Sequence, residues 1–376
     1  MQFLFRIFKR IHYRNISFRF FLLFLGLLSI NCPKQPELSE LLNQRIKQNY
    51  SETVELDIFF ATLRSPKPLS SKACSNANFS NLLGSELRFG KCKVNTPSEH
   101  SVGSLDSANT GYRNKFFSMR EYSNLDSATF SKNLGLSSED DIIVFVHGFN
   151  VGFEEAIYRA AQIKYDMKYQ GDILVYTWPA GAEDESFLSQ LFMKGIYETN
   201  LQNAINSRAH FRSILDSLEK SGKKIHLIAH SMGHQVVLPV LSSKFKADQK
   251  PFLSELILNA PDFDINEYRG IHSDVVNSAT RVTLYCSPGD NALVASQKVN
   301  GNARVGMCAR FEGMDVINVN EVDDPVLGVG GLGHGYYSSR PILTDIYQVL
   351  LGIKVEKRLF IRRSGLGNSE QFVLRK

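Results

Sequence analysis

Short apolar runs alternate with longer segments of helical spacing through the second half of the chain. Residues 141–146 (DIIVFV) and 172–177 (DILVYT) are apolar at nearly every position after the first, which is typical of strands buried on both faces. The further predicted strands are residues 225–228, 253–259, 281–285 and 316–319, and the predicted helices are 152–169, 201–218, 232–241 and 341–351. This alternation predicts an α/β fold, with a doubly wound, mostly parallel sheet and helices on both faces. Such sheets bind ligands at the carboxyl ends of their strands.

The two ends of this region add further strands. Residues 54–63, 87–94 and 112–120 have strand character, and a loop rich in serine, proline, lysine and asparagine occupies 65–81. Residues 360–376, with a turn at Gly365-Leu366-Gly367, predict a terminal hairpin. We therefore expect one large domain over residues 52–376.

Residues 1–31 have the pattern of an export signal. Five basic residues precede an apolar run, residues 20–30, that is too short to span a bilayer comfortably. The run ends in LSINC, which resembles the lipobox before a lipid-modified cysteine, although Asn31 replaces the common glycine or alanine. We expect a lipoprotein-type signal peptide, lipidation at Cys32 and a tether over 32–51, which would anchor the protein in the cell envelope at the outer membrane or periplasmic face. A plain secretory signal and an uncleaved anchor are the alternatives, and all three export the domain.

The net charge of the chain bears on its partners. Without its first 31 residues the chain's formal charge falls from +5 to 0, because that segment holds five basic residues and no acidic one. We therefore expect no nucleic-acid partner.

If Cys32 carries lipid, four cysteines remain, and an even number in an exported protein favours disulfides. Pairing Cys74 with Cys92 and Cys286 with Cys308 is the simplest of the three possible connectivities.

A serine lies where a strand would turn abruptly into a helix. The segment AHSMG, residues 229–233, is a relative of the G-x-S-x-G nucleophile elbow. The tight turn demands small residues two positions before and after Ser231, and Ala229 keeps the small size of the usual glycine. The elbow would expose Ser231 Oγ and place the Met232 amide, at a helix N-terminus, where an oxyanion develops.

A second oxyanion donor is expected directly after the strand 141–146. His147-Gly148-Phe149-Asn150 places a glycine and then a backbone amide at the carboxyl edge, where α/β-hydrolases supply this donor. The Phe149 amide is the candidate. We interpret His147 as a structural residue that braces the loop rather than as a catalytic one.

An acid and a base for Ser231 follow later strands. Asp262 and Asp290 compete as the acid, and the usual order, which puts the acid after the later strand, favours Asp290. Each aspartate would alternatively cap a helix. His334, in a glycine-rich loop after the last strand, is the histidine placed to act as the base. The order Ser231, Asp290, His334 is that of α/β-hydrolases.

Three histidines resemble a metal site by spacing alone. His226, His230 and His234 are four residues apart, as ligands on one helix face would be. Because they fall in a predicted strand, a turn and a helix, they share no face. The sequence also has no C-x-x-C pair, so we expect neither a metal nor a cofactor.

Residues 183–197 follow the Trp178-Pro179 strand end. Their apolar side chains are Phe187, Leu188, Leu191, Phe192 and Met193. Two interpretations are open: a mobile flap that offers apolar surface to an acyl chain, or an ordinary helix packed on the core.

From Leu56 to the C-terminus the chain resembles the uncharacterised bacterial α/β-hydrolases grouped as a domain of unknown function. The matching segments are LDIFFATLR (56–64), FGKCKVNTPSEHSVG (89–103), VFVHGFN (144–150), YTWPAG (176–181), AHSMGHQ (229–235), APDFD (260–264), SPGDNAL (287–293) and HGYY (334–337). The resemblance implies an α/β-hydrolase domain with Ser231, Asp290 and His334 as its triad, and implies little about the substrate. Ala229 and the glycine after His334 depart from the family pattern.

These observations predict an exported serine hydrolase, similar to esterases and lipases, that cleaves ester, thioester or amide bonds through an acyl-enzyme. Its substrate would be a small-molecule or lipid acyl compound, and its lipidated N-terminus would bind the membrane. Two other functions are open. The same residues would serve acyl transfer to an acceptor other than water, and the fold alone would serve as a binding scaffold without activity.

Overall fold

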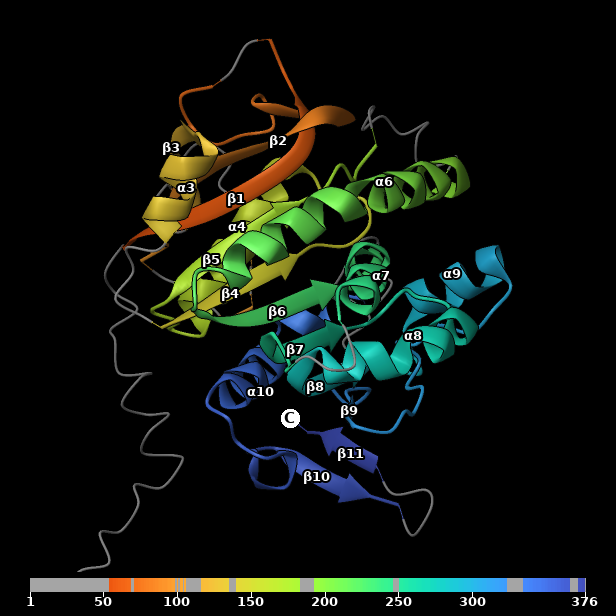
Figure 1. The fold of residues 1–376 in the computed structure, drawn as a ribbon. Helices are drawn as coiled ribbons and strands as arrows, with labels where there is room; N and C mark the ends of the chain where they lie inside the picture. Colours follow the sequence, from red (N-terminus) through yellow and green to blue (C-terminus); the bar gives the residue numbers. More distant parts are fainter. Residues whose placement is uncertain are drawn as a thin grey trace, which may run out of the picture. The chain divides into compact units, whose positions relative to one another are not determined.

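One eleven-stranded sheet runs through the computed structural model (Figure 1). The structure describes residues 54–68, 71–98, 100, 102–103, 105, 116–134, 140–182, 193–245, 250–322, 334–365 and 371–375. The predicted signal peptide, the tether and Cys32 lie outside these residues. So do residues 183–192 of the predicted flap, the glycines at 331 and 333, and the middle of the predicted C-terminal turn.

The sheet is parallel across its centre and antiparallel at both edges. Its strands are β1 (Glu55–Pro66), β2 (Phe79–Asn95), β3 (Ser118–Leu125), β4 (Asp141–Val146), β5 (Asp172–Thr177), β6 (Lys224–His230), β7 (Leu253–Asn259), β8 (Ala279–Cys286), β9 (Met314–Asn318), β10 (Ile361–Ser364) and β11 (Gln371–Leu374). In the order β10-β11-β9-β8-β7-β6-β4-β5-β1-β2-β3, the neighbours from β11 to β1 are parallel. The pairs β1–β2, β2–β3 and β10–β11 are antiparallel, and the last is the predicted terminal hairpin.

Helices cover both faces of this sheet, as the sequence predicted. They are α3 (Ser127–Leu134), α4 (Phe153–Asp166), α6 (Met193–Glu219), α7 (His234–Lys244), α8 (Ile265–Asn277), α9 (Asn291–Asn300) and α10 (Arg340–Leu350), with 3-10 turns η1 (Ser231–Gly233), η3 (Tyr336–Ser338) and η4 (Val355–Lys357). Alternate side chains of β4 belong to two separate cores: Ile143 packs with α4 and α10, and Val144 packs with α6, α7 and α8. The doubly wound, mostly parallel fold class is confirmed.

Several boundaries differ from the prediction. β2 begins inside the predicted loop 65–81, because its antiparallel ladder with β1 continues as far as the pair Pro66 and Phe79. α6 begins eight residues before the predicted position 201, and its added turns bury Tyr197 and Asn200. These residues carry polar groups, so a pattern of apolar positions does not include them. α3 was not predicted.

Two disulfides join Cys74 with Cys92 and Cys286 with Cys308. The predicted pairing within each half of the chain is confirmed. The second bond ties the end of β8 to the segment that follows α9. Among the helices that the structure describes, none is long and apolar enough to cross a membrane.

Replacing both Cys286 and Cys308 by alanine should lower the free energy of unfolding by about 3 kcal/mol. A crosslink that closes a loop of this size, here 22 residues in sequence separation, restricts the unfolded chain. Urea unfolding followed by fluorescence measures the loss. The matched control is the Cys74→Ala, Cys92→Ala protein, with a separation of 18 residues, which should lose a similar amount. An unfolding midpoint equal to that of the unmodified protein in both variants would contradict the expectation.

Candidate active site

Ser231 lies in the turn between β6 and α7. Its φ of 51° is left-handed, a conformation that costs a residue other than glycine about 1–3 kcal/mol. A Cβ on Gly233 would lie 2.5 Å from the His147 carbonyl oxygen, and Ala229 is fully buried. The turn therefore requires the small residues that the elbow pattern demands at these two positions.

Two hydrogen bonds to the carbonyl oxygen of Ser231 hold the backbone of this turn. The Ser231 carbonyl oxygen accepts from His234 Nδ1 at 2.7 Å and from the Asp262 amide at 3.3 Å. Met232 is the next residue and lies in the first turn of the helical segment η1–α7, where backbone N–H groups have no intrahelical acceptor. The Met232 amide is therefore next to the serine at a helix N-terminus, as predicted.

His334 and Asp290 are in direct contact. His334 Nδ1 donates to Asp290 Oδ2 at 2.6 Å, and the Asp290 side chain is completely buried. Asp290 also caps α9, because its Oδ1 accepts from the Leu293 amide at 3.1 Å. One carboxylate thus contacts His334 and caps α9 at the same time. The cap fixes the orientation of the carboxylate that faces the histidine.

The loop that carries His334 packs against His230, the residue before Ser231. His230 Nε2 donates to the His334 carbonyl oxygen at 3.2 Å, and the His230 ring stacks on Tyr337 with 3.7 Å between centroids. His334 Nε2 is buried and makes no hydrogen bond among the described residues, so in this conformation it is not bonded to Ser231 Oγ. The structure brings the three predicted side chains to the same edge of the sheet and leaves the serine–histidine bond unmade.

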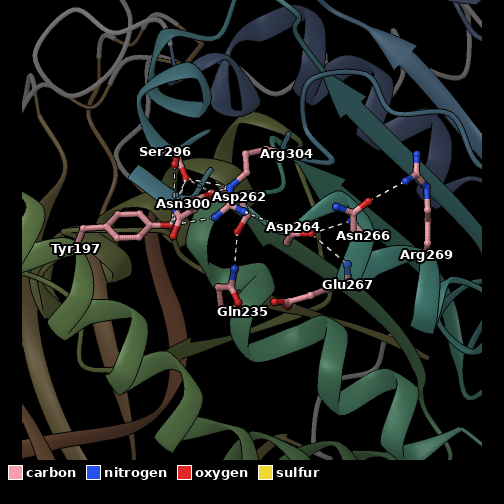
Figure 2. Close-up of polar contacts among 10 residues, drawn as sticks. All are labelled: Tyr197, Gln235, Asp262, Asp264, Asn266, Glu267, Arg269, Ser296, Asn300 and Arg304. Atoms are coloured by element: carbon pink, nitrogen blue, oxygen red, sulfur yellow. Dashed lines mark hydrogen bonds and ion pairs between the residues drawn. The ribbon is translucent and has the colours of Figure 1, made fainter. Parts of the chain in front are cut away.

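The competing acid, Asp262, lies in a different polar cluster (Figure 2). Its Oδ1 pairs with Arg304 Nε at 2.8 Å and accepts from Ser296 Oγ at 2.5 Å, and its Oδ2 accepts from Tyr197 Oη at 3.0 Å. Asn300 Nδ2 donates to the same tyrosine oxygen at 3.0 Å. Among the described residues, the Asp262 carboxylate therefore contacts this cluster and not His334.

The partners of the Asp262 carboxylate were not predicted from the sequence. Arg304 and Tyr197 lie in segments without a motif, and they are 42 and 65 residues from Asp262 in the chain. Burial, with the charge of Asp262 beside it, raises the pKa of Tyr197, so this hydroxyl stays protonated. The cluster joins the start of α6 to α9, and the ring of Tyr197 packs against Phe149 at 5.8 Å.

The loop after β4 lies directly against Ser231. A Cβ on Gly148 would lie 2.8 Å from Ser231 Cβ and 2.9 Å from His230 Nδ1, so this position requires glycine. The amide of Phe149, which follows, donates no hydrogen bond to any other residue within the described ranges. This loop therefore presents an unused donor beside the serine.

His147 braces the same loop. Its Nδ1 donates to the Gly148 carbonyl at 3.0 Å, and its ring stacks on Trp178 at 5.3 Å, nearly parallel. Trp178 Nε1 donates in turn to the His147 carbonyl at 2.8 Å. Burial, and then the charge of Arg64, lower the pKa of His147 to about 3, which keeps the imidazole neutral. These contacts fit the interpretation of His147 as a structural residue.

The three evenly spaced histidines do not share one helix face. His226 lies early in β6 and faces Asp141 at 3.4 Å, whereas His230 ends that strand and His234 begins α7. Across the described ranges, no group of three His, Cys, Asp or Glu side chains is gathered as metal ligands.

Comparison with known proteins places the chain in a family. A model of the alpha/beta hydrolases of unknown function (DUF900) matches residues 123–354. The chain belongs to this family. A search of curated proteins found no match for this hydrolase.

Solved structures resemble this hydrolase more distantly. One is a phospholipase, PlaB from Legionella pneumophila in complex with thio-NAD, with 14% identity, a TM-score of 0.32, and coverage of 63% of this chain and 67% of that one. Another is a cold-adapted esterase from an Arctic intertidal metagenomic library, with 12% identity, a TM-score of 0.32, and coverage of 61% and 79%.

Two buried histidines should make this hydrolase less stable in acid. Burial lowers the pKa of both His147 and His234 to about 3, from an ordinary value of 6.5. Between these values the unfolded chain binds more protons, so stability is full above pH 6.5 and falls as the pH drops toward 3. Each histidine contributes up to about 1.4 kcal/mol per pH unit to this slope.

Urea unfolding of the unmodified protein and of a His147→Asn variant at pH 4, 5, 6 and 7 measures the effect. His147 and His234 together make the free energy of unfolding rise with pH, and the variant should lose about half of that dependence. Equal slopes in the two proteins would show that His147 takes up no proton on unfolding.

Proposed function

We propose that this protein is an exported serine hydrolase that cleaves ester, thioester or amide bonds through Ser231, His334 and Asp290. The observation that carries the proposal is the bond from His334 Nδ1 to a carboxylate whose other oxygen caps α9. A histidine held in this way keeps its Nε2 free of the proton, as a general base must. The strained conformation of Ser231 at the edge of the same sheet supports the nucleophile assignment.

Acylation would begin when Ser231 Oγ attacks the carbonyl carbon of the substrate. His334 Nε2 takes the serine proton, and Asp290 stabilises the imidazolium that forms. The transfer needs Nε2 within hydrogen-bond distance of Oγ, a contact that often tightens only when substrate is bound. The imidazolium then gives its proton to the leaving group, and the acyl group remains on the serine.

Two backbone amides would stabilise the negative charge on the carbonyl oxygen. The Met232 amide lies at the start of η1–α7, and the Phe149 amide lies in the loop that contacts Ser231 through Gly148. Each such donor is worth about 2.7–4 kcal/mol in acyl transfer. Water, activated by His334, then releases the acyl group by the same route.

The proposal includes export and membrane attachment through a lipid on Cys32, in the cell envelope. The basic and apolar pattern of residues 1–31 supports it, and the two disulfides are expected of a protein in an oxidising compartment. We propose an acyl compound, either a small ester or a lipid, as the substrate, with the membrane as the surface on which the enzyme is held.

The Ser231→Ala variant should lose all reaction with a fluorophosphonate label and about 10⁶-fold in ester hydrolysis. Only the side-chain oxygen of Ser231 is placed to attack in this mechanism. Gel fluorescence after labelling of native protein measures the loss, and heat-denatured protein is the control for non-specific labelling. Equal labelling of Ser231→Ala would remove Ser231 from the role, and no labelling of the native unmodified protein would favour a binding scaffold.

Two aspartate substitutions of the same size separate the acid from its competitor. Asp290→Asn should slow ester hydrolysis about 10⁴-fold, because the amide holds the imidazole in the wrong tautomer. Asp262→Asn should instead lower stability by about 3–5 kcal/mol, because it removes the closer of the two carboxylates that face the buried Arg304 and leaves only Asp264, at 3.7 Å. Its activity per folded molecule should stay within about tenfold of the unmodified protein.

Active-site titration gives the folded, active fraction, and steady-state assays on a short-chain ester give the rate. If Asp262→Asn lost as much activity per titrated site as Asp290→Asn, the assignment of the acid would be wrong.

A further inference from the structure

Arg64 is a completely buried guanidinium at the carboxyl end of β1. Its Nε donates to Thr177 Oγ1 at 2.9 Å, and its Nη2 donates to the Val151 carbonyl at 2.7 Å. Its Nη1 donates both to Asn81 Oδ1 at 2.6 Å and to the Ala180 carbonyl at 2.8 Å. The side chain thus joins β2 and the segments that follow β4 and β5.

None of these acceptors carries a charge. Among the described residues, the two other buried arginines each face a carboxylate: Arg304 pairs with Asp262 at 2.8 Å and Arg358 with Asp345 at 3.3 Å. Arg64 has no carboxylate within 4.0 Å in the described part of the chain. Burial lowers the pKa of Arg64 to about 9, and the negative charge of Glu155 raises it by a smaller amount. The guanidinium is therefore charged at neutral pH.

Burying a charge with no carboxylate in ion-pair contact is costly, and neutral hydrogen bonds and the more distant charge of Glu155 recover only part of that cost. A purely structural clamp would be more stable with a carboxylate opposite it or with an apolar side chain. The arrangement at Arg64 therefore leaves a positive charge available to a group that becomes negative.

The loop after β4, which holds the Phe149 amide, is bonded to Arg64 at Val151. Val151, whose carbonyl Arg64 holds, is two residues after Phe149, and Asn200 Oδ1 accepts from the Asn150 amide at 3.2 Å. Asn200 Oδ1 also accepts from the Gly181 amide, next to Ala180. Arg64 and Asn200 thus fix the segments after β4 and β5 against each other. The charge of Arg64 also contributes to the low pKa of His147 at the start of the loop.

We propose that Arg64 is a positioning residue of the oxyanion site: it holds the 147–151 loop so that the Phe149 amide faces the reacting carbonyl, and it adds positive potential there. The inference rests on the proposed hydrolase function and deepens it. In the ground state the carbonyl oxygen is neutral, whereas in the tetrahedral state it carries negative charge. Arg64 therefore acts on the chemical step and hardly on substrate binding.

Two substitutions separate charge from shape. Arg64→Met removes the charge and the hydrogen bonds, and Arg64→Lys keeps a charge but not the planar fork that reaches several acceptors. The control is Arg281→Met, which removes a guanidinium bonded to Glu255 and to the carbonyls of Val349 and Ile353 near the start of β8. Like Arg64, Arg281 is bonded to several acceptors, but it lies near the opposite edge of the sheet.

Steady-state kinetics on a short-chain ester and the second-order rate of fluorophosphonate labelling are measured on the full-length folded proteins, with urea unfolding in parallel. Arg64→Met should lower kcat and the labelling rate by about 10- to 100-fold, which is less than the loss in kcat when a direct oxyanion donor is removed. The KM of this variant should stay within about threefold of that of the unmodified protein. Arg281→Met should lower stability but keep kcat within about twofold.

Arg64→Lys adds a signature that a structural role would not produce. A buried ammonium loses its proton below the ordinary lysine pKa of about 10.4. The kcat of this variant should therefore begin to fall at a lower pH than that of the unmodified protein, whose guanidinium has a pKa of about 9.

The outcomes are separable. If the unmodified protein does not react with the label, the proposed function fails before Arg64 is tested. If it reacts and folded Arg64→Met keeps kcat within about twofold, Arg64 is only structural and the inference is overturned. If Arg64→Met does not fold, the pH profile of Arg64→Lys decides, and a profile that begins to fall at no lower pH than that of the unmodified protein overturns the inference.

Discussion

At Ser231 the chain passes from strand to helix through a single left-handed residue, in surroundings too crowded for a wider turn. Gly148 and Gly233 allow the neighbouring backbone to approach the serine, and a Cβ at either position would meet atoms at 2.8 or 2.5 Å. The same crowding sets the place of the loop after β4. Ser231 and the Phe149 amide are thus positioned by backbone packing, which side-chain motion changes little.

The remaining polar groups at this edge are fixed by bonds that each serve two elements. Asp290 caps α9 with one oxygen and receives His334 with the other, so the helix orients the histidine. Asp262 joins Arg304 to the start of α6 through Tyr197. These contacts make the site a product of several strands and helices, which is expected where parallel strands end together.

Much of this arrangement was predictable from local pattern. Residues 141–146 and 172–177 were predicted at their observed bounds, because strands buried on both faces are continuous apolar runs. Asp290 and His334 were identified by their positions after successive strands, and the structure places them in contact. The disulfides followed from the even number of cysteines and their grouping.

Other features had no local signal. The partners of the Asp262 carboxylate are more than 30 residues away, and the acceptors of Arg64 are 17 to 116 residues away. Apolar periodicity also missed the first turns of α6, because Tyr197 and Asn200 are buried for their hydrogen bonds. The unmade bond between Ser231 and His334 depends on the conformation of side chains, which no spacing in the sequence specifies.

A crystal structure of the fluorophosphonate adduct would test the proposed active site most directly. Phosphorus should be bonded to Ser231 Oγ, with its oxygen about 2.7–3.1 Å from both the Phe149 and Met232 amides and with His334 Nε2 hydrogen-bonded to the adduct. Phosphorus on a different residue, or a phosphonyl oxygen turned away from both amides, would contradict the proposed active site.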